Sequence, residues 1–140
     1  MRAVVGFVAV VVAMGVMAGP AVGATVQVQV FDSEFSPDPT INIGDTVRWV
    51  WSSFMSHNVR AVNGAPEVFD SGHHFGDEHT FEYTFTKAGV TNYYCDLHGF
   101  DAGNGTAGGM AGRITVVPEP GVIAMLLPAA GLLARRRPRG

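Results

Sequence analysis

The sequence predicts an all-β domain, a sandwich or barrel of about seven to eight short strands. Two observations indicate this class. Apolar and polar residues alternate in several short runs, which is the period of a strand with one buried face. Turn-forming residues separate these runs, as in SPDP, IGD, NGAP and KAG, and residues 25–117 contain no convincing helical period.

Seven runs are expected as strands, in chain order 25–31, 40–43, 46–51, 57–62, 79–85, 91–95 and 112–117. In the first run three valines alternate with two glutamines, so the valines share one face. The run TVRWVW places Trp49 and Trp51 on one side, and HTFEYTF does the same with Phe81 and Phe85. We expect these four aromatic residues to form core rather than a substrate platform.

Residues 1–24 have the layout of a secretory signal peptide. The single cationic residue Arg2 precedes a long apolar run, which ends in the small residues before Thr25. We expect cleavage after Ala24. An uncleaved transmembrane anchor is the alternative, because the apolar run is nearly long enough to cross a bilayer.

Residues 118–140 contain a Pro-Glu-Pro turn, a short apolar segment at 121–134 and a basic cluster made of Arg135, Arg136, Arg137 and Arg139. The apolar segment is shorter than the roughly 20 residues that span a bilayer, so it predicts only transient membrane attachment. The arginines are expected to stay cytoplasmic. This tail resembles a PEP-CTERM sorting signal, which implies processing by an exosortase-type enzyme. The resemblance places the protein in the periplasm, outer envelope or extracellular matrix of a Gram-negative-type bacterium; a plain C-terminal anchor is the alternative.

Removal of both segments leaves residues 25–117, which we expect to form one small monomeric domain. This segment has four Arg and Lys against eleven Asp and Glu, a formal charge of −7, whereas the full chain has −3. A negative domain is a poor match for nucleic acid, so a nucleic-acid partner is not expected. A basic protein partner suits this charge.

The only cysteine, Cys95, cannot form an internal disulfide, although small exported domains often depend on such bridges. The thiol is therefore free, bridged to another molecule or bound to a metal. A buried apolar role is the simplest alternative, since free cysteine packs well in a core.

Three further residues make the metal interpretation more specific. His98 follows Cys95 after two residues, His57 begins another predicted strand, and Met110 closes a glycine-rich segment. Thiolate sulfur together with imidazole nitrogen suits copper or zinc. Two histidines, a cysteine and a weak methionine ligand form the donor set of a blue-copper electron-transfer site. Taken singly, His57 would be an ordinary polar residue and Met110 a core filler.

Four segments in this order, FSPDPTINIGDTVRWVW, SHNV, FEYTFTKAGVTNYYCDLHG and GGMAGRITV, resemble a plastocyanin-type cupredoxin, a blue type 1 copper protein. The resemblance spans nearly all of residues 25–117 and implies a Greek-key sandwich with one copper ion. It assigns His57, Cys95, His98 and Met110 as the copper ligands. It also assigns Asn58 to join the His57 loop to the cysteine loop as support for the ligands.

The chain departs from this family between the last two ligands. Eleven residues separate His98 from Met110, where the family has about four, and six glycines from 99 to 112 give this insertion room to bulge outward. The departure leaves the axial position open. Asp101, Asn104, a backbone oxygen or water could take the place of Met110.

Other features of the chain carry weaker expectations. The family docks redox partners on an apolar patch around its exposed histidine, which here implies Leu97, Gly99 and Phe100 beside His98. Five neighbouring residues could hold a second metal, but they are expected to be solvated loop residues: His73, His74, Asp77, Glu78 and His79.

The expected function is an exported, non-enzymatic carrier that shuttles single electrons between redox partners by cycling Cu(I) and Cu(II), with electron exit near His98. The chain has no Gly-x-Ser-x-Gly, phosphate loop or HExxH motif. The alternatives are a copper-binding or copper-delivery module without electron transfer and an open-site mononuclear copper enzyme.

Overall fold

The computed structural model describes residues 22–119. The predicted signal peptide and sorting tail lie almost entirely outside this range. All secondary-structure elements of these described residues are β-strands, so the all-β prediction is confirmed. The strands are β1 (Thr25–Val30), β2 (Phe35–Ser36), β3 (Thr40–Asn42), β4 (Thr46–Trp51), β5 (Ser56–His57), β6 (Arg60–Ala61), β7 (His74–Phe75), β8 (Thr80–Thr84), β9 (Gly89–Asp101) and β10 (Ala107–Val117). None of these described residues forms a helix with the length and apolar character needed to span a bilayer.

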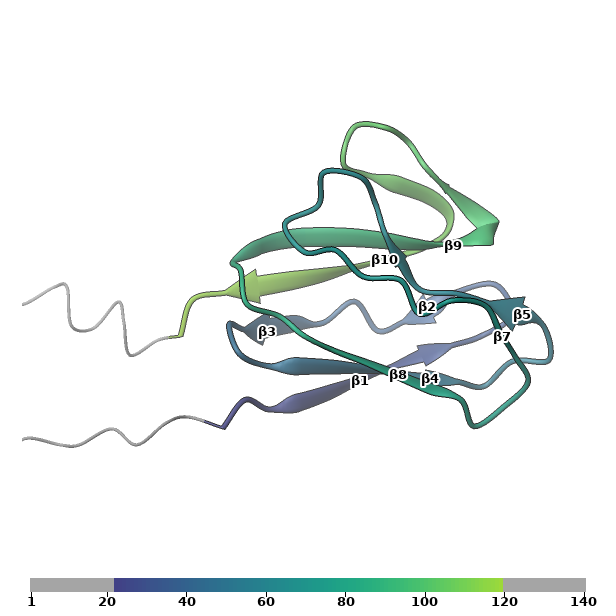
Figure 1. Ribbon diagram of the computed structural model, residues 1–140, viewed down its shortest axis with the longest axis horizontal. Helices are drawn as coiled ribbons and strands as arrows, with labels where there is room; N and C mark the ends of the chain where they lie inside the picture. The colour runs from purple at the N-terminus through teal and green to yellow at the C-terminus, as the bar shows by residue number, and fades with distance from the viewer. Residues whose placement is uncertain (1–21, 120–140) are drawn as a thin grey trace, which may run out of the picture.

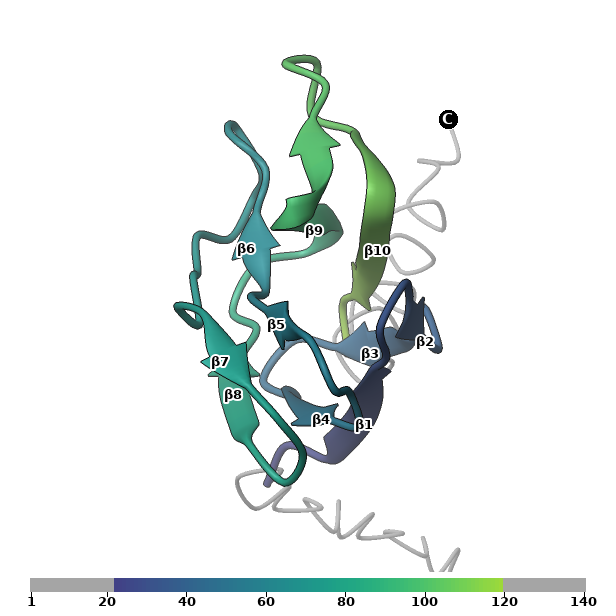
Figure 2. The same cartoon turned by 90° about the vertical axis from the view of Figure 1, so that its right-hand side faces the viewer.

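Two four-stranded sheets pack face to face as a β-sandwich (Figure 1). The strand order is β2-β1-β4-β8 in the first sheet and β3-β10-β9-β6 in the second. β1 runs parallel to β4 and β10 runs parallel to β3, while the other pairs are antiparallel. A separate ribbon of β5 and β7 closes one end of the sandwich (Figure 2). The described chain ends leave together at the opposite end (Figure 1).

The core follows from the alternation seen in the sequence. On β4 the side chains of Val47, Trp49 and Trp51 are at most 1% exposed, while the intervening residues are less buried. The Trp49 ring is the centre of an aromatic cluster, with ring centroids at 5.3 to 6.5 Å from those of Phe69, Phe81, Phe85 and Tyr93. Tilted and edge-on pairs of this kind add to the free energy gained by burial. The predicted core role is confirmed for Trp49, Trp51 and Phe85, while Phe81 is partly buried and packs against the core.

The expected strand at 57–62 is two strands in different sheets. β5 pairs with β7, and β6 lies at the edge of the second sheet. Between them the backbone of Val59 turns toward Ser71: its N–H donates to Ser71 Oγ (2.9 Å), and its carbonyl accepts from Ser71 N–H (3.0 Å). The prediction of one continuous strand is wrong because these bonds redirect the chain directly after His57. The two-residue strands β2 and β7 were also not predicted, since they are too short to show a period.

The last two strands are longer than the sequence predicts, because part of the glycine-rich segment is strand rather than loop. Residues 99–101 of β9 pair with residues 107–109 of β10 and form a hairpin beyond the end of the expected ladder (Figure 2). A Cβ on Gly99 would lie 2.7 Å from the carbonyl oxygens of Gly108 and Met110. Glycine therefore permits the close approach of the two strands here, a use of glycine that strand propensity does not reveal.

Candidate metal centre

The pairing of β9 with β10 is interrupted at the residues that the sequence singled out. Tyr94 pairs with Ala111, and the next pair along the ladder is Gly99 with Gly109. Four residues of β9, 95–98, thus lie opposite the single residue Met110 of β10. We call residues 95–98 the ligand loop. An irregularity of this kind turns side chains away from the regular alternation of a strand, and here it occurs at Cys95 and His98.

Three donor atoms converge at the end of the sandwich nearest β5. The Sγ atom of Cys95 lies 3.6 Å from Nδ1 of His57 and 3.5 Å from Nδ1 of His98. The two Nδ1 atoms are 3.1 Å apart. Across residues 22–119, no other group of three His, Cys, Asp or Glu side chains has its potential ligand atoms this close together. Cys95 and His57 are fully buried, and His98 is partly exposed.

The chemistry of this donor set fits a copper ion. Metal bonds of about 2.0 Å to nitrogen and about 2.3 Å to sulfur place donors of one ion on the order of 3.3 to 3.7 Å apart, close to the three distances found. One proton can bridge only one pair of the three facing atoms, whereas one ion can satisfy all of them. Imidazole with thiolate is a combination that copper and zinc both accept.

The surroundings of His57 keep its ring neutral, the form that binds metals. Burial lowers the pKa of His57, the neighbouring His98 lowers it further, and the opposing effect of Asp32 is smaller. Its buried Nε2 has no hydrogen-bond partner, since the nearest carboxylate oxygen, Oδ1 of Asp32, lies 3.8 Å away. When the single hydrogen of the neutral ring is on Nε2, Nδ1 is available for a metal ion.

The loop before His57 is held by the side chain of Asp32. Its Oδ1 accepts hydrogen bonds from Ser53 Oγ (2.5 Å) and from the N–H groups of Phe54 (2.9 Å) and Met55 (3.3 Å). The bonds from Ser53 and from these backbone groups hold the pKa of Asp32 below its ordinary value. A carboxylate thus fixes the chain just before β5 and orients the segment that carries His57.

Asn58 links the two loops of the site. Its side chain is 1% exposed, and its Oδ1 accepts the backbone N–H of Asp96 at 2.9 Å. Its Nδ2 donates to Oδ2 of the same aspartate at 3.2 Å. The residue after His57 is therefore bonded directly to the residue after Cys95, so the two donors cannot move independently.

Met110 is 2% exposed and belongs to the same buried cluster as Cys95. The ladder on both sides of it fixes its position opposite the ligand loop. Asp101 and Asn104, the stand-ins that the sequence left open, are used elsewhere. Asp101 accepts the N–H groups of Asn63 (2.7 Å) and Gly103 (2.8 Å). Asn104 accepts the side-chain hydroxyl of Thr106 at 2.6 Å. Both residues organise the hairpin tip.

The histidines of residues 73–79 do not form a second metal group. His74 and His79 stack with centroids 3.4 Å apart, against the edge of Trp51. His73 is exposed and forms a hydrogen bond with Asp96 instead, with Nε2 at 2.6 Å from Oδ1. That contact with the ligand loop was not expected, and no pattern in the sequence could have indicated it, since 23 residues separate the partners.

Large apolar side chains are exposed on the ligand loop, just after it and near β5. Leu97 and Phe100, expected as part of an apolar docking patch, are 54% and 59% exposed. Two more exposed rings near β5 were not predicted: Phe54 is 80% exposed, and Phe75 on β7 is 79% exposed. Phe75 pairs with Ser56, the residue before His57. Their position outside the alternating runs could have indicated that these two aromatic residues are exposed. Exposed aromatic side chains are typical of contact surfaces.

Comparison with known proteins agrees with this geometry. The model of the copper binding proteins of the plastocyanin/azurin family matches residues 24–117. Amicyanin from Paracoccus denitrificans is 36% identical over 69 residues, which are 49% of this chain and 53% of amicyanin. Amicyanin from Paracoccus versutus is 35% identical over 69 residues, 49% of this chain and 52% of that protein. The chain thus matches about half the length of these relatives.

Solved structures extend the likeness to the fold. A reduced tryptophan-to-tyrosine mutant of amicyanin has a TM-score of 0.53 and 26% identity, covering 69% of this chain and 85% of that one. Amicyanin from Paracoccus versutus gives 0.51 and 27%, covering 71% and 85%. A purple cupredoxin from Nitrosopumilus maritimus shares the fold at 22% identity with a TM-score of 0.51, covering 65% and 98%. With its β-sandwich and its histidine and cysteine cluster, the chain belongs to the plastocyanin/azurin family of copper binding proteins.

Proposed function

We propose that this protein is an exported blue copper protein that shuttles single electrons between redox partners, with His57, Cys95, His98 and Met110 as ligands. The observation that carries the proposal is the convergence of one sulfur and two nitrogen atoms within 3.6 Å of one another. Copper, when bound there, supplies the one-electron chemistry of the Cu(I)/Cu(II) couple. The activity requires no substrate pocket or general acid.

The residues around the donors favour a site that changes little during such a cycle. Asn58 ties the ligand loop to the His57 segment, and Asp32 fixes the loop before it. Both fully buried donors, His57 and Cys95, are held by packing. Pre-organised supports of this kind hold ligands in one geometry, which keeps the structural cost of gaining or losing an electron small.

We place the route of electrons at His98. It is the only one of the three converging donors with solvent exposure, and Leu97, Gly99 and Phe100 adjoin it. The exposed apolar side chains offer a contact surface, and the charge of −7 on residues 25–117 favours a basic redox partner. The rings of Phe54, just before β5, and Phe75, on β7, are exposed as well.

The chain ends are compatible with processing at both termini. The described ends emerge opposite β5 and β7, so a leader or a tail attached there leaves the metal end free (Figure 1). We propose that residues 1–24 direct export and that an exosortase-type enzyme removes the tail after transient membrane attachment. The resulting monomer would act in the periplasm, outer envelope or extracellular matrix.

The test is the visible absorption and EPR spectrum of residues 25–117 loaded with Cu(II), compared with Cys95→Ser. We expect an intense blue colour from thiolate-to-copper charge transfer, together with narrow copper hyperfine splitting, and both should disappear in Cys95→Ser. A pale spectrum that Cys95→Ser does not change would contradict the proposal.

The axial ligand has its own test. Met110→Leu removes the thioether but keeps an apolar side chain of similar size, so we expect the blue colour to persist while the reduction potential changes. Met55→Leu is the matched control, because Met55 is 45% exposed and only two residues from His57. Equal potentials for Met110→Leu and the wild type would mean that Met110 only fills core space.

A further inference from the structure

Asp96 is the charged member of the ligand loop, between Cys95 and Leu97. Its side chain is 28% exposed and receives groups from two other segments. Asn58 Nδ2 lies 3.2 Å from Oδ2, and Arg60 Nη1 lies 3.6 Å from the same oxygen. His73 Nε2 lies 2.6 Å from Oδ1. The loop that carries two of the proposed ligands is thus held from outside through one carboxylate.

The bond from His73 has a defined direction. An ionised carboxylate only accepts hydrogen bonds, so the hydrogen lies on Nε2 of His73, and this N–H group is the donor of the hydrogen bond to Asp96. Hydrogen bonds to charged groups are shorter and stronger than neutral ones, and 2.6 Å agrees with this. The interaction therefore restrains the ligand loop more than a neutral surface contact would.

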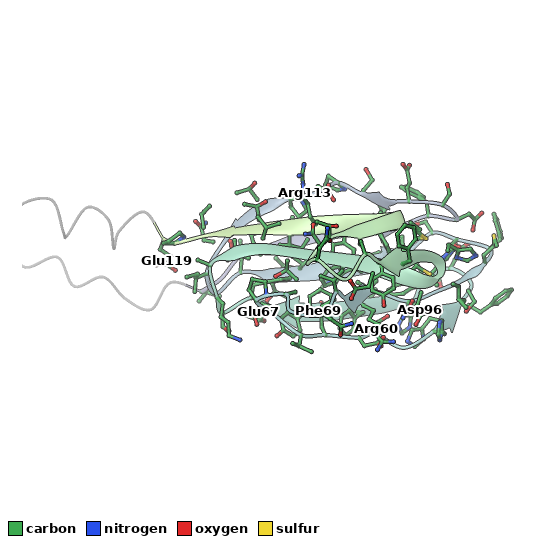
Figure 3. The ribbon with its side chains drawn as sticks, turned by 90° about the horizontal axis from the view of Figure 1, so that it is seen from above. Arg60, Glu67, Phe69, Asp96, Arg113 and Glu119 are labelled. Atoms are coloured by element: carbon green, nitrogen blue, oxygen red, sulfur yellow. The ribbon has the colours of Figure 1, made fainter. Side chains whose placement is uncertain are left out.

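A second carboxylate, that of Asp70, fixes the backbone just before His73. Oδ1 of Asp70 accepts the N–H of Gly72 at 2.9 Å and lies 3.4 Å from Nδ2 of Asn58. Its Oδ2 lies 3.6 Å from Nε of Arg60. Arg60 thus lies between Asp70 and Asp96, and Figure 3 shows Arg60 and Asp96 close together toward one end of the molecule. We call Asn58, Arg60, Asp70, His73 and Asp96 the Asp96 clamp.

We propose that His73 and Asp96 are positioning residues for the copper site: the His73 bond fixes the ligand loop, and the Asp96 carboxylate favours the more highly charged Cu(II) state. The proposal rests on the proposed function. A negative charge next in sequence to Cys95 stabilises the higher of two positive charges by Coulomb attraction, which partial burial strengthens. Asp96 thereby lowers the reduction potential, and His73 limits the motion of the loop.

Three variants at Asp96 and His73 separate these roles. Asp96→Asn removes the charge and keeps the size, but its single amide oxygen can replace only one of the two acceptors, so the bond from His73 or the contacts of Asn58 and Arg60 are also lost. Comparison with His73→Ala, which loses the His73 bond but keeps the charge, isolates the electrostatic effect. His73→Ala removes the donor, and His73→Gln restores an N–H group near the position of Nε2. Glu82→Gln is the control, because Glu82 is also paired with an arginine, Arg48, but lies on β8 in the other sheet.

Each variant is loaded with Cu(II) for potentiometry and EPR, and amide hydrogen exchange is followed on the copper-free protein. We expect an upward shift of the reduction potential in Asp96→Asn that Glu82→Gln does not show. In His73→Ala, exchange of the ligand-loop amides should rise about fivefold, the factor expected from loss of one net hydrogen bond. The copper hyperfine splitting should change with it, and His73→Gln should restore both.

An Asp96→Asn potential equal to that of Glu82→Gln overturns the electrostatic part of the proposal. Unchanged loop exchange in copper-free His73→Ala overturns the positioning part, whatever the metal does. Failure of the proposed function looks different, because the wild type itself would then lack the blue colour.

Discussion

Two buried polar centres of this domain differ in how their polar atoms are satisfied. The Glu67 carboxylate, in a 3% exposed side chain, accepts hydrogen bonds from Thr86 N–H and Oγ1, Lys87 N–H and Tyr83 OH at 2.6 to 3.0 Å. At the metal centre, by contrast, the donor atoms of His57, Cys95 and His98 face one another and compete for protons. The acceptor oxygens of Glu67 are satisfied by protein hydrogen bonds, whereas the facing atoms of His57, Cys95 and His98 can all be satisfied only by a bound ion. This difference distinguishes a structural centre from a binding one.

The pKa of Glu67 also reflects these hydrogen bonds. Burial alone would raise it, but the bonds from the Thr86 backbone, Tyr83, the Lys87 backbone and the Thr86 hydroxyl together hold it below its ordinary value of 4.5. The ionised form is thus stabilised in the folded state. At the metal centre the burial of His57 disfavours charge, and the opposing effect of Asp32 is too small to compensate.

The largest expected effect is on Glu67. Glu67→Ala leaves buried donors from Thr86, Lys87 and Tyr83 without an acceptor, so the free energy of unfolding should fall by about 3 kcal/mol. Urea unfolding of the copper-free protein measures it. The exposed Glu82→Ala is the control, with a loss of about 0 to 1 kcal/mol. Equal losses in the two variants would mean that Glu67 is not a structural centre.

The geometry of the metal centre should depend on the close backbone contact between Gly109 and His98. Gly109 has φ +72°, and a Cβ there would lie 2.6 Å from the carbonyl oxygen of His98; Gly103 has φ +79° and open space. Gly103→Ala should cost about 1 to 2 kcal/mol for the left-handed backbone alone. Gly109→Ala should cost more and also alter the copper spectrum. Equal stability and equal spectra for the two would show that the hairpin does not position the ligand loop.

Acid should destabilise the fold through the Glu67 centre. Because the folded pKa of Glu67 lies below 4.5, its stabilising contribution is present above that value and is lost as pH falls through the folded pKa. The unfolded state binds the proton more readily in this window, so stability rises with pH there. Glu67→Gln should lack this part of the acid dependence. Unfolding curves between pH 3 and 6 (a range of about three units around the ordinary glutamate pKa) test it, and identical slopes would contradict it.

The smallest expected change is at His57. Its Nε2 has no partner, so His57→Leu, an apolar residue of similar size, should change the stability of the copper-free protein by less than about 1 kcal/mol. Added copper should then raise the melting temperature of the wild type but not of the variant, since only a bound ion shifts the folding equilibrium. A large loss without copper would mean that His57 is structural, like Glu67.

The elements that the sequence predicts well are those with local patterns. Alternating valines and aromatic residues indicated β1, β4 and β8, and the Cys95-x-x-His98 spacing with a distant His57 indicated three donors that the fold brings together. The break after His57 was not predictable, because it depends on bonds to Ser71. The bond between His73 and Asp96 escaped for the same reason: nothing near either residue in the chain marks it.

The sequence by itself determined the all-β class and the types of donor atom, because side-chain alternation and ligand chemistry are properties of neighbouring residues. Only the tertiary structure decided the register that sets Met110 opposite the ligand loop and makes a hairpin of the glycine-rich insertion. Register depends on backbone hydrogen bonds and close approach between strands, as at Gly99 and Gly109. Those contacts exist only when β9 and β10 lie side by side.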